Sequence, residues 1–167
     1  DDMVINPSCV EKHLAANDSA LKRIVLGQVV EPSNASDNEI KKYKDFLNQS
    51  WFKKVASYKQ QNLPTSFTYL SAQNFSISKN LFTELGGFNQ QLKDVEDYDL
   101  AIRAKSNNIH IYYLDEAIAI HLDSFTFRKY AERSKAYLTN RLLAASFNPD
   151  LYKNDPILTH NHGVPLQ

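Results

Sequence analysis

Two adjacent glycines followed by a dense run of acids do most to limit how this chain can fold. Gly86 and Gly87 are half of the four glycines in 167 residues, and they stand between apolar residues. A glycine pair in that setting indicates a turn that side chains would obstruct. Glu96, Asp97 and Asp99 follow where we expect a helix to begin, and a helix amino terminus favours negative charge. We therefore expect this stretch to hold carboxylates in place at a surface.

Short apolar runs alternate with helical patterns along the rest of the chain. We expect strands at residues 1–6, 24–30, 66–72 with a continuation at 74–77, 109–113 and 117–120. We expect helices starting at residue 7 or 8 and over 39–60, 79–85, 95–106 and 125–147, with loops at 31–38 and 61–65. The first helix should bury Val10, Leu14 and, as a further candidate, Leu21. This alternation predicts an α/β layered fold.

The composition excludes several classes of protein. Nineteen basic and nineteen acidic residues balance, so no overall charge points to a nucleic-acid partner. No apolar run is long enough to span a membrane. A single cysteine, Cys9, cannot form an internal disulfide, and a reducing compartment is compatible with that. We expect a cytoplasmic protein, free or lying against a membrane surface. The locally basic 39–60 helix we interpret as a solvated face, with phosphate contact as the alternative.

Three groups of chemically capable residues stand at the ends of expected elements. Asp1-Asp2 borders an apolar strand, Glu96-Asp97 begins a helix, and His121 directly follows an apolar strand. Open α/β sheets bind ligands beyond the carboxyl ends of their strands, so the three groups could share one cleft.

The order of these motifs resembles that of family-2 glycosyltransferases with the GT-A fold. Gly-Gly-Phe, seven residues, then Glu-Asp-x-Asp-Leu-x-x-Arg, which ends at Arg103, looks like the family signature. Residues 74–77 (Asn-Phe-Ser-Ile) are similar to the strand before it, and residues 109–121 to the strand pair that ends in the family's histidine. Residues 1–4 (Asp-Asp-Met-Val) are similar to the close of the Asp-x-Asp motif. The resemblance covers about residues 1–124.

The resemblance implies roles for particular residues. Asp2 would be the second aspartate of the Asp-x-Asp motif and His121 a further ligand, both holding a divalent cation, Mn²⁺ or Mg²⁺, against the diphosphate of a nucleotide-sugar donor. Asp97 would be the catalytic base, and Glu96 its neighbour that contacts the acceptor or a loop. The chemistry independently requires such groups. A cation neutralises the charge on the diphosphate leaving group, and a carboxylate accepts the proton of the acceptor hydroxyl. One base with direct displacement predicts an inverting transfer to a carbohydrate or glycan acceptor.

The resemblance also implies a domain organisation. Residues 1–124 would be the acceptor-side part of a GT-A domain, whose nucleotide-binding half we expect to precede this chain. Residues 125–147 would form a long amphipathic helix, and residues 148–167 a proline-containing, loosely ordered tail. The helix and tail could cover the acceptor cleft, pack on a partner domain or lead towards a membrane.

Plainer structural interpretations remain open at each position. Asp97 could simply cap its helix, and Asp99 could pair with Arg103 four residues later. His121 could be a hydrogen-bonded histidine at the edge of the core. Trp51 and Tyr69 we assign to the core, with a sugar platform as the alternative. The rival function is a non-catalytic α/β module whose acidic cluster binds a cation or a polar partner.

Overall fold

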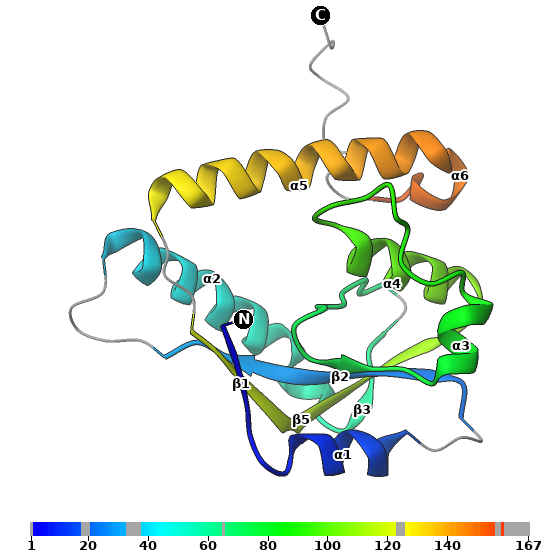
Figure 1. The fold of residues 1–167 in the computed structure, drawn as a ribbon, viewed down its shortest axis with the longest axis horizontal. Helices are drawn as coiled ribbons and strands as arrows, with labels where there is room; N and C mark the ends of the chain where they lie inside the picture. The colour runs from blue at the N-terminus through cyan, green and yellow to red at the C-terminus, as the bar shows by residue number, and fades with distance from the viewer. Residues whose placement is uncertain are drawn as a thin grey trace, which may run out of the picture.

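The computed structural model describes residues 2–17, 21–32, 38–64, 66–122, 126–155 and 158. They form a mixed α/β fold in which helices flank a curled, open sheet (Figure 1). The α/β class expected from the sequence is confirmed at this level. No helix of the described residues is long and apolar enough to cross a membrane.

Strands and helices are interspersed along the described chain. The strands are β1 (Met3–Ile5), β2 (Arg23–Val30), β3 (Gln61–Asn62), β4 (Phe75–Ser76) and β5 (His110–His121). The helices are α1 (Cys9–Ala16), α2 (Glu39–Val55) with the 3₁₀ turn η1 (Ala56–Tyr58), α3 (Lys79–Glu84), α4 (Glu96–Ser106), α5 (Phe127–Phe147) and α6 (Pro149–Tyr152).

Strand β5 is the centre of the sheet, whose order is β1-β5-β2-β4 with β3 also paired to β5. β2 runs parallel to β5, whereas β1 and β3 pair with β5 in the antiparallel sense. β1 pairs with the last residues of β5 and β3 with its earlier part, so both lie on the edge of β5 opposite β2. The carboxyl end of β5 therefore lies beside the start of the described chain.

A bulge interrupts the register between β2 and β5. Gly27 pairs with Leu114, but the next residue of β2 pairs with Ile118, so three residues of β5 have no partner on β2. The expected pair of strands at 109–113 and 117–120 is therefore wrong: they are one strand, bulged where a break was expected. A bulge keeps the strand continuous while it changes the local twist.

Asn74 fills the space beside this bulge. A Cβ atom on Gly27 would lie 2.6 Å from the carbonyl oxygen of Ala117 and would also meet the Asn74 side chain. In its place the Asn74 amide Nδ2 donates to the carbonyls of Gln28 (2.9 Å) and Ala117 (2.8 Å). The Gly27 amide donates back to the Asn74 carbonyl at 2.9 Å. The bulge and residue 74 thus hold each other in position.

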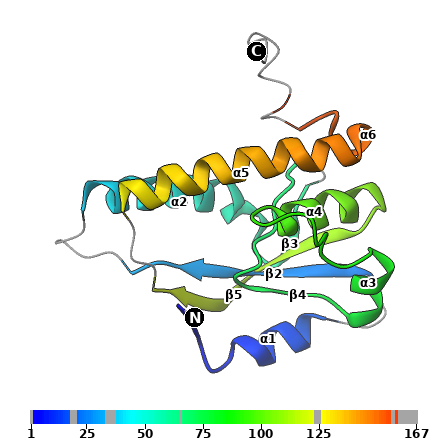
Figure 2. The same ribbon diagram turned by 45° about the horizontal axis from the view of Figure 1, so that its top comes forward.

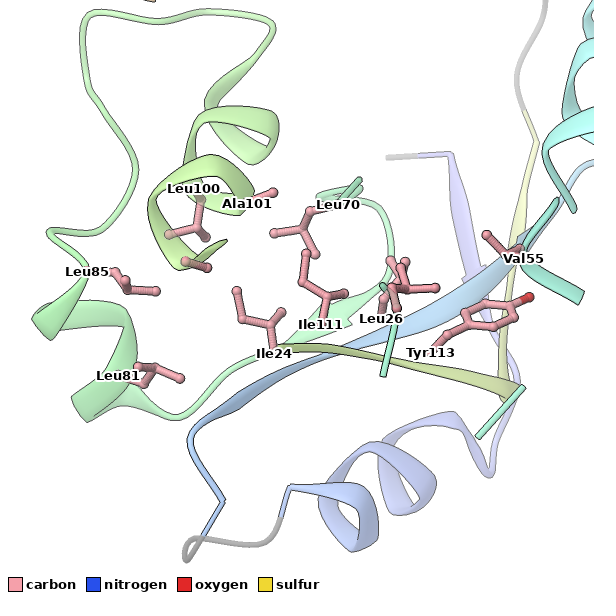
Figure 3. Close-up of a cluster of buried hydrophobic side chains, with 12 residues drawn as sticks. Ile24, Leu26, Val55, Leu70, Leu81, Leu85, Leu100, Ala101, Ile111 and Tyr113 are labelled. Carbon is pink, nitrogen blue, oxygen red and sulfur yellow. The ribbon is translucent and has the colours of Figure 1, made fainter. Parts of the chain in front are cut away.

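The two faces of the sheet are covered differently (Figure 2). Helix α1 lies on one face, whereas α2 and α4 cover the other, and α5 lies beyond them as a further layer (Figures 1 and 2). The largest cluster of buried side chains lies between the sheet and the α2–α4 layer. Figure 3 shows its members from β2, β5 and the helices, including Ile24, Leu26, Ile111, Leu100 and Val55.

A second cluster joins α4 to the end of the described chain. Tyr98 and Ile102 of α4 pack with Ala144 of α5 and Tyr152 of α6. Tyr152 and Asp155 are buried, so the expectation of a loosely ordered tail from residue 148 is wrong for residues 149–155. His160 and His162, in the same tail, lie outside the described residues.

Helix α1 buries a different side from the one expected. Val10 and Leu14 are 56% and 69% exposed, and Leu21, beyond the helix, is 52% exposed. Cys9 and His13 are buried instead. Hydrogen bonds explain the orientation, because the ring nitrogens of His13 contact Ser76 (2.8 Å) and Asn74 (2.9 Å). Satisfied polar contacts here outweigh the apolar periodicity.

The segment before β4 does not form the strand expected at 66–72. Only Phe75 and Ser76 pair with β2, and residues 67–71 form no regular element. The Tyr69 ring instead packs on Trp51 of α2, with ring centroids 4.2 Å apart. Both rings pack against the main core, so the alternating pattern reflects packing on a helix rather than on a sheet. The loop expected at 61–65 contributes the short strand β3.

Candidate functional site

The glycine turn is fixed to helix α4 by one arginine. Gly86 and Gly87 have φ angles of +85° and +67°, a region that side-chain-bearing residues rarely adopt. Arg103 donates to the carbonyls of Leu85 and Gly87, the latter at 2.7 Å. Its Nε also donates to Asp99 at 2.8 Å, which confirms the expected Asp99–Arg103 pair. Asp99 is therefore occupied by structural contacts.

Asp97 lies in the first turn of α4 and faces the loop before β4. Its Oδ1 accepts from the amide of Tyr98 at 2.7 Å and its Oδ2 from the amide of Ala72 at 2.9 Å. The residue at the N-cap position of the helix is Val95, so Asp97 is not the cap. Burial raises the pKa of Asp97, while the two amides and the charge of Arg133 act against that rise.

Glu96 is the first residue of α4 and is partly buried. Its Oε2 is shielded from solvent and has no hydrogen-bond partner among the described residues. An unpaired buried oxygen is uncommon, since it loses its hydration without replacement. Glu96 therefore offers an acceptor atom that the described part of the fold leaves unused.

His121 lies at the end of β5 between two carboxylates. Its Nε2 is 3.3 Å from Oδ2 of Asp2, and its Nδ1 is 3.0 Å from Oε1 of Glu31. The backbone sets this up, because the amide of Leu122 donates to the carbonyl of Asp2 at 2.7 Å. A hydrogen bond from its own backbone amide, aided by His121, holds the pKa of Asp2 below its ordinary value.

Glu31 determines how His121 can be used. An Nδ1–H that donates to the carboxylate of Glu31 leaves the lone pair of Nε2 facing Asp2. A carboxylate behind the ring in this way is the usual support of a metal-binding histidine. Glu31 is itself fixed by Lys44 of α2, whose Nζ is 2.8 Å from Oε1. The side-chain amide of Gln73 lies 3.2 Å from the same Nδ1 and can present its oxygen to the N–H after a rotation.

One short loop connects the two halves of this region. Ala72 contacts Asp97 through its amide, and the next residue, Gln73, contacts His121 through its side chain. Asn74, which follows, fixes the loop to the bulge of β5. The fold thus brings Asp2 and His121 into contact and connects both, through residues 72 and 73, to Asp97.

A groove opens next to this loop, between α2 and α5. Its volume is about 560 Å³, within the range of roughly 300–1,000 Å³ typical of small-molecule sites. Gln73, His121 and Glu31 line one part of it. The remaining lining comes from the two helices: Lys44, Leu47, Asn48, Tyr130, Arg133, Ser134, Tyr137 and Leu138.

The donor set suits a divalent cation only with help from a ligand. Among the described residues, no group of three or more His, Cys, Asp or Glu side chains is arranged to hold a metal ion. Asp2 and His121 would therefore be the protein's two donors. Mg²⁺ commonly binds to one or two carboxylates and completes its shell with water and substrate phosphates, so a two-donor site fits a cation bound together with a diphosphate. Asp1 lies outside the described residues.

Several residues of the region were not expected from the sequence. Glu31 was assigned to a loop and Lys44 to a solvated face, and no role was given to Gln73, Arg133 or Tyr137. For Glu31 a signal existed, because an acid directly after a buried strand is the same pattern that singled out His121. The sequence contains no comparable signal for the α5 residues Arg133 and Tyr137, because hydrophobic periodicity does not indicate where a helix packs.

Comparison of the chain with protein-family models gave no match, and comparison with curated protein sequences gave none either.

Proposed function

We propose that this chain is the acceptor-side part of a metal-dependent, inverting glycosyltransferase of family 2, which uses a nucleotide-sugar donor. The observation that carries the proposal is the link made by residues 72 and 73. Through it Asp97, a partly buried carboxylate, is connected to the Asp2–His121 pair by two adjacent residues. A transferase of this kind needs a base and a diphosphate-neutralising site beside one another.

Asp97 is suited to accept a proton. Its two amide contacts fix the carboxylate without consuming all its lone pairs, and burial raises its pKa towards the range useful for a base. In the proposed reaction Asp97 takes the proton of the acceptor hydroxyl as the hydroxyl oxygen attacks the anomeric carbon. The bond from that carbon to the diphosphate oxygen breaks on the opposite face, which inverts the configuration.

Asp2 and His121 would hold the cation at the diphosphate. When bound, the cation neutralises the negative charge that grows on the leaving group. Glu31, by fixing the Nδ1 proton of His121, keeps Nε2 available on the side of Asp2. Glu96, with its unpaired buried oxygen, is placed to accept a hydrogen bond from the acceptor or from a loop that closes over it.

The test is donor-dependent transfer by the full-length protein in the presence of Mn²⁺. Asp97→Asn should lower turnover by about 10²–10⁴-fold, because the amide cannot take the proton. Asp94→Asn, which removes a carboxylate three residues earlier, is the matched control and should leave turnover nearly unchanged. Equal turnover of Asp97→Asn and the native protein would exclude Asp97 as the base.

The rival proposal is a non-catalytic module, and one observation favours it. Both ring nitrogens of His121 already contact carboxylates, an arrangement that is complete without a cation. This proposal expects that Mn²⁺ binds, or that the cluster only stabilises the fold, and that no sugar is transferred. Calorimetric titration with Mn²⁺ for the native protein and His121→Ala, run beside the transfer assay, separates the two.

A further inference from the structure

The groove between α2 and α5 carries charge that the proposed base and cation site do not explain. Of its charged residues, Glu31 and Lys44 pair with each other, and Glu31 also contacts His121. Arg133 is the remaining one. It is exposed on α5 and makes no hydrogen bond or ion pair in the part of the chain that the structure describes.

Arg133 lines the same groove as His121 and Glu31, and its positive charge also reaches Asp97. Tyr137, one helical turn further along α5, is likewise within the electrostatic reach of Asp97. A group held by Arg133 would therefore be close to the hydroxyl that Asp97 activates.

The rest of the lining suits a sugar ring. Tyr130 and Tyr137 offer aromatic rings, which pack well against the C–H faces of a pyranose, and Asn48 and Ser134 offer hydrogen-bonding groups. Such a lining, with one cation that makes no ion pair among the described residues, favours a ligand that is a polar ring with a single negative substituent.

We infer that the α2–α5 groove binds the acceptor and selects a sugar that carries an anionic substituent, a carboxylate or a phosphate, through Arg133. The inference deepens the proposed function and rests on it, because the bound sugar is an acceptor only if the protein is a glycosyltransferase. The guanidinium forms paired, charge-assisted hydrogen bonds with the two oxygens of the substituent. This places the adjoining hydroxyls of the ring beside Asp97.

Binding, which needs no donor and no turnover, tests the inference. Glucuronate, glucose 6-phosphate, glucose and acetate are titrated into the full-length protein, and dissociation constants are measured by ligand-observed NMR. At least one of the two anionic sugars should bind about tenfold more tightly than glucose, as expected for one charge-assisted contact of about 1.5 kcal/mol. The arm that shows the preference identifies carboxylate or phosphate as the substituent.

Substitutions assign the preference to Arg133. Arg133→Gln should abolish it, Arg133→Lys should keep part of it, and Lys135→Gln, an exposed cation of the same helix outside the groove, should leave it intact. A preference that survives in Arg133→Gln overturns the inference, as does equal binding of glucose, or acetate binding as tightly as glucuronate. If the preference holds but no transfer occurs, the proposed function fails while the anionic-sugar site stands.

Discussion

At the scale of single residues, the partial burial of the Asp97 carboxylate has an energetic cost. A carboxylate that loses water on folding is harder to ionise, and two backbone amides offset only part of that loss. A raised pKa of this kind is what the proposed role of Asp97 as a base requires.

The raised pKa of Asp97 predicts how stability depends on pH. A carboxyl group with a higher pKa in the folded than in the unfolded protein binds its proton more tightly when folded, so protonation favours folding. As pH falls from neutral through the raised pKa towards the ordinary value of 3.8, the native protein should gain stability relative to Asp97→Asn. Urea unfolding of both proteins across this range measures the difference, and a difference that does not change with pH would contradict the raised pKa.

The Asp99–Arg103 pair was predictable from local geometry, whereas the distant contact of Glu31 with His121 was not. Asp99 and Arg103 stand four apart on one helix, and their contact follows from helix geometry. The contact of Glu31 with His121 joins residues 90 positions apart and depends on the register of β2 on β5. A bulge changes that register by three residues, so no pattern in either strand alone gives the contact.

At the scale of elements, the bulge of β5 and the loop before β4 form one unit. Asn74 donates to the carbonyl of Ala117 in the bulge and to that of Gln28 beside it, and it does so because Gly27 leaves room. Residues 72 and 73, which reach Asp97 and His121, directly precede this anchor. The geometry of the candidate site therefore depends on a sheet irregularity that touches neither carboxylate.

Loss of this anchor should be costly. Asn74→Ala removes the side-chain donor to the carbonyls of Gln28 and Ala117 and should destabilise the fold by about 2–3 kcal/mol. Chemical denaturation measures this. Asn80→Ala, an exposed asparagine of α3, is the control and should change stability by less than about 0.5 kcal/mol. Equal effects at the two positions would show that the bulge needs no side-chain partner.

The sequence predicted most helices and failed where pairing partners decide the structure. The ranges of α3, α4 and α5 lie within a few residues of those expected, since caps and periodicity are local signals. Residues 66–72 alternate like a strand, but the rings of Phe67 and Tyr69 pack on Trp51 of α2. A local sequence pattern cannot distinguish a segment that packs on a helix from one that pairs in a sheet.

At the scale of the whole molecule, residues 149–155 belong to the fold rather than to a tail. Arg141 of α5 is buried, donates to Asp155 and to the hydroxyl of Tyr98, and covers the ring of Tyr98. Tyr152 donates to Asp99 at 2.7 Å. These contacts fix α5 and α6 on α4, and with them the groove that Arg133 and Tyr137 line. A buried arginine looks solvent-facing in sequence, which is why this docking was not expected.

The buried Arg141–Asp155 pair should behave as a unit. Asp155→Ala leaves the guanidinium without its counter-ion and should cost about 3–5 kcal/mol of stability. The double variant Arg141→Met, Asp155→Leu should cost less than that single change. Glu132→Ala, which breaks the exposed Arg128–Glu132 pair of the same helix, should cost no more than about 1 kcal/mol. Additive effects of the two buried changes in urea unfolding would contradict this coupling.

The fit between Gly27 and Asn74 also restricts how this protein can diverge. A methyl group at position 27 would meet both the Asn74 side chain and the backbone carbonyl oxygen of Ala117 in the bulge, and that carbonyl loses its side-chain donor if the asparagine is lost first. Either single step passes through a destabilised intermediate, so positions 27 and 74 should change only together with the bulge. Homologous sequences, once aligned, should show position 27 and position 74 as a covarying pair, and those that lack the pair should also have a different length between the two halves of β5.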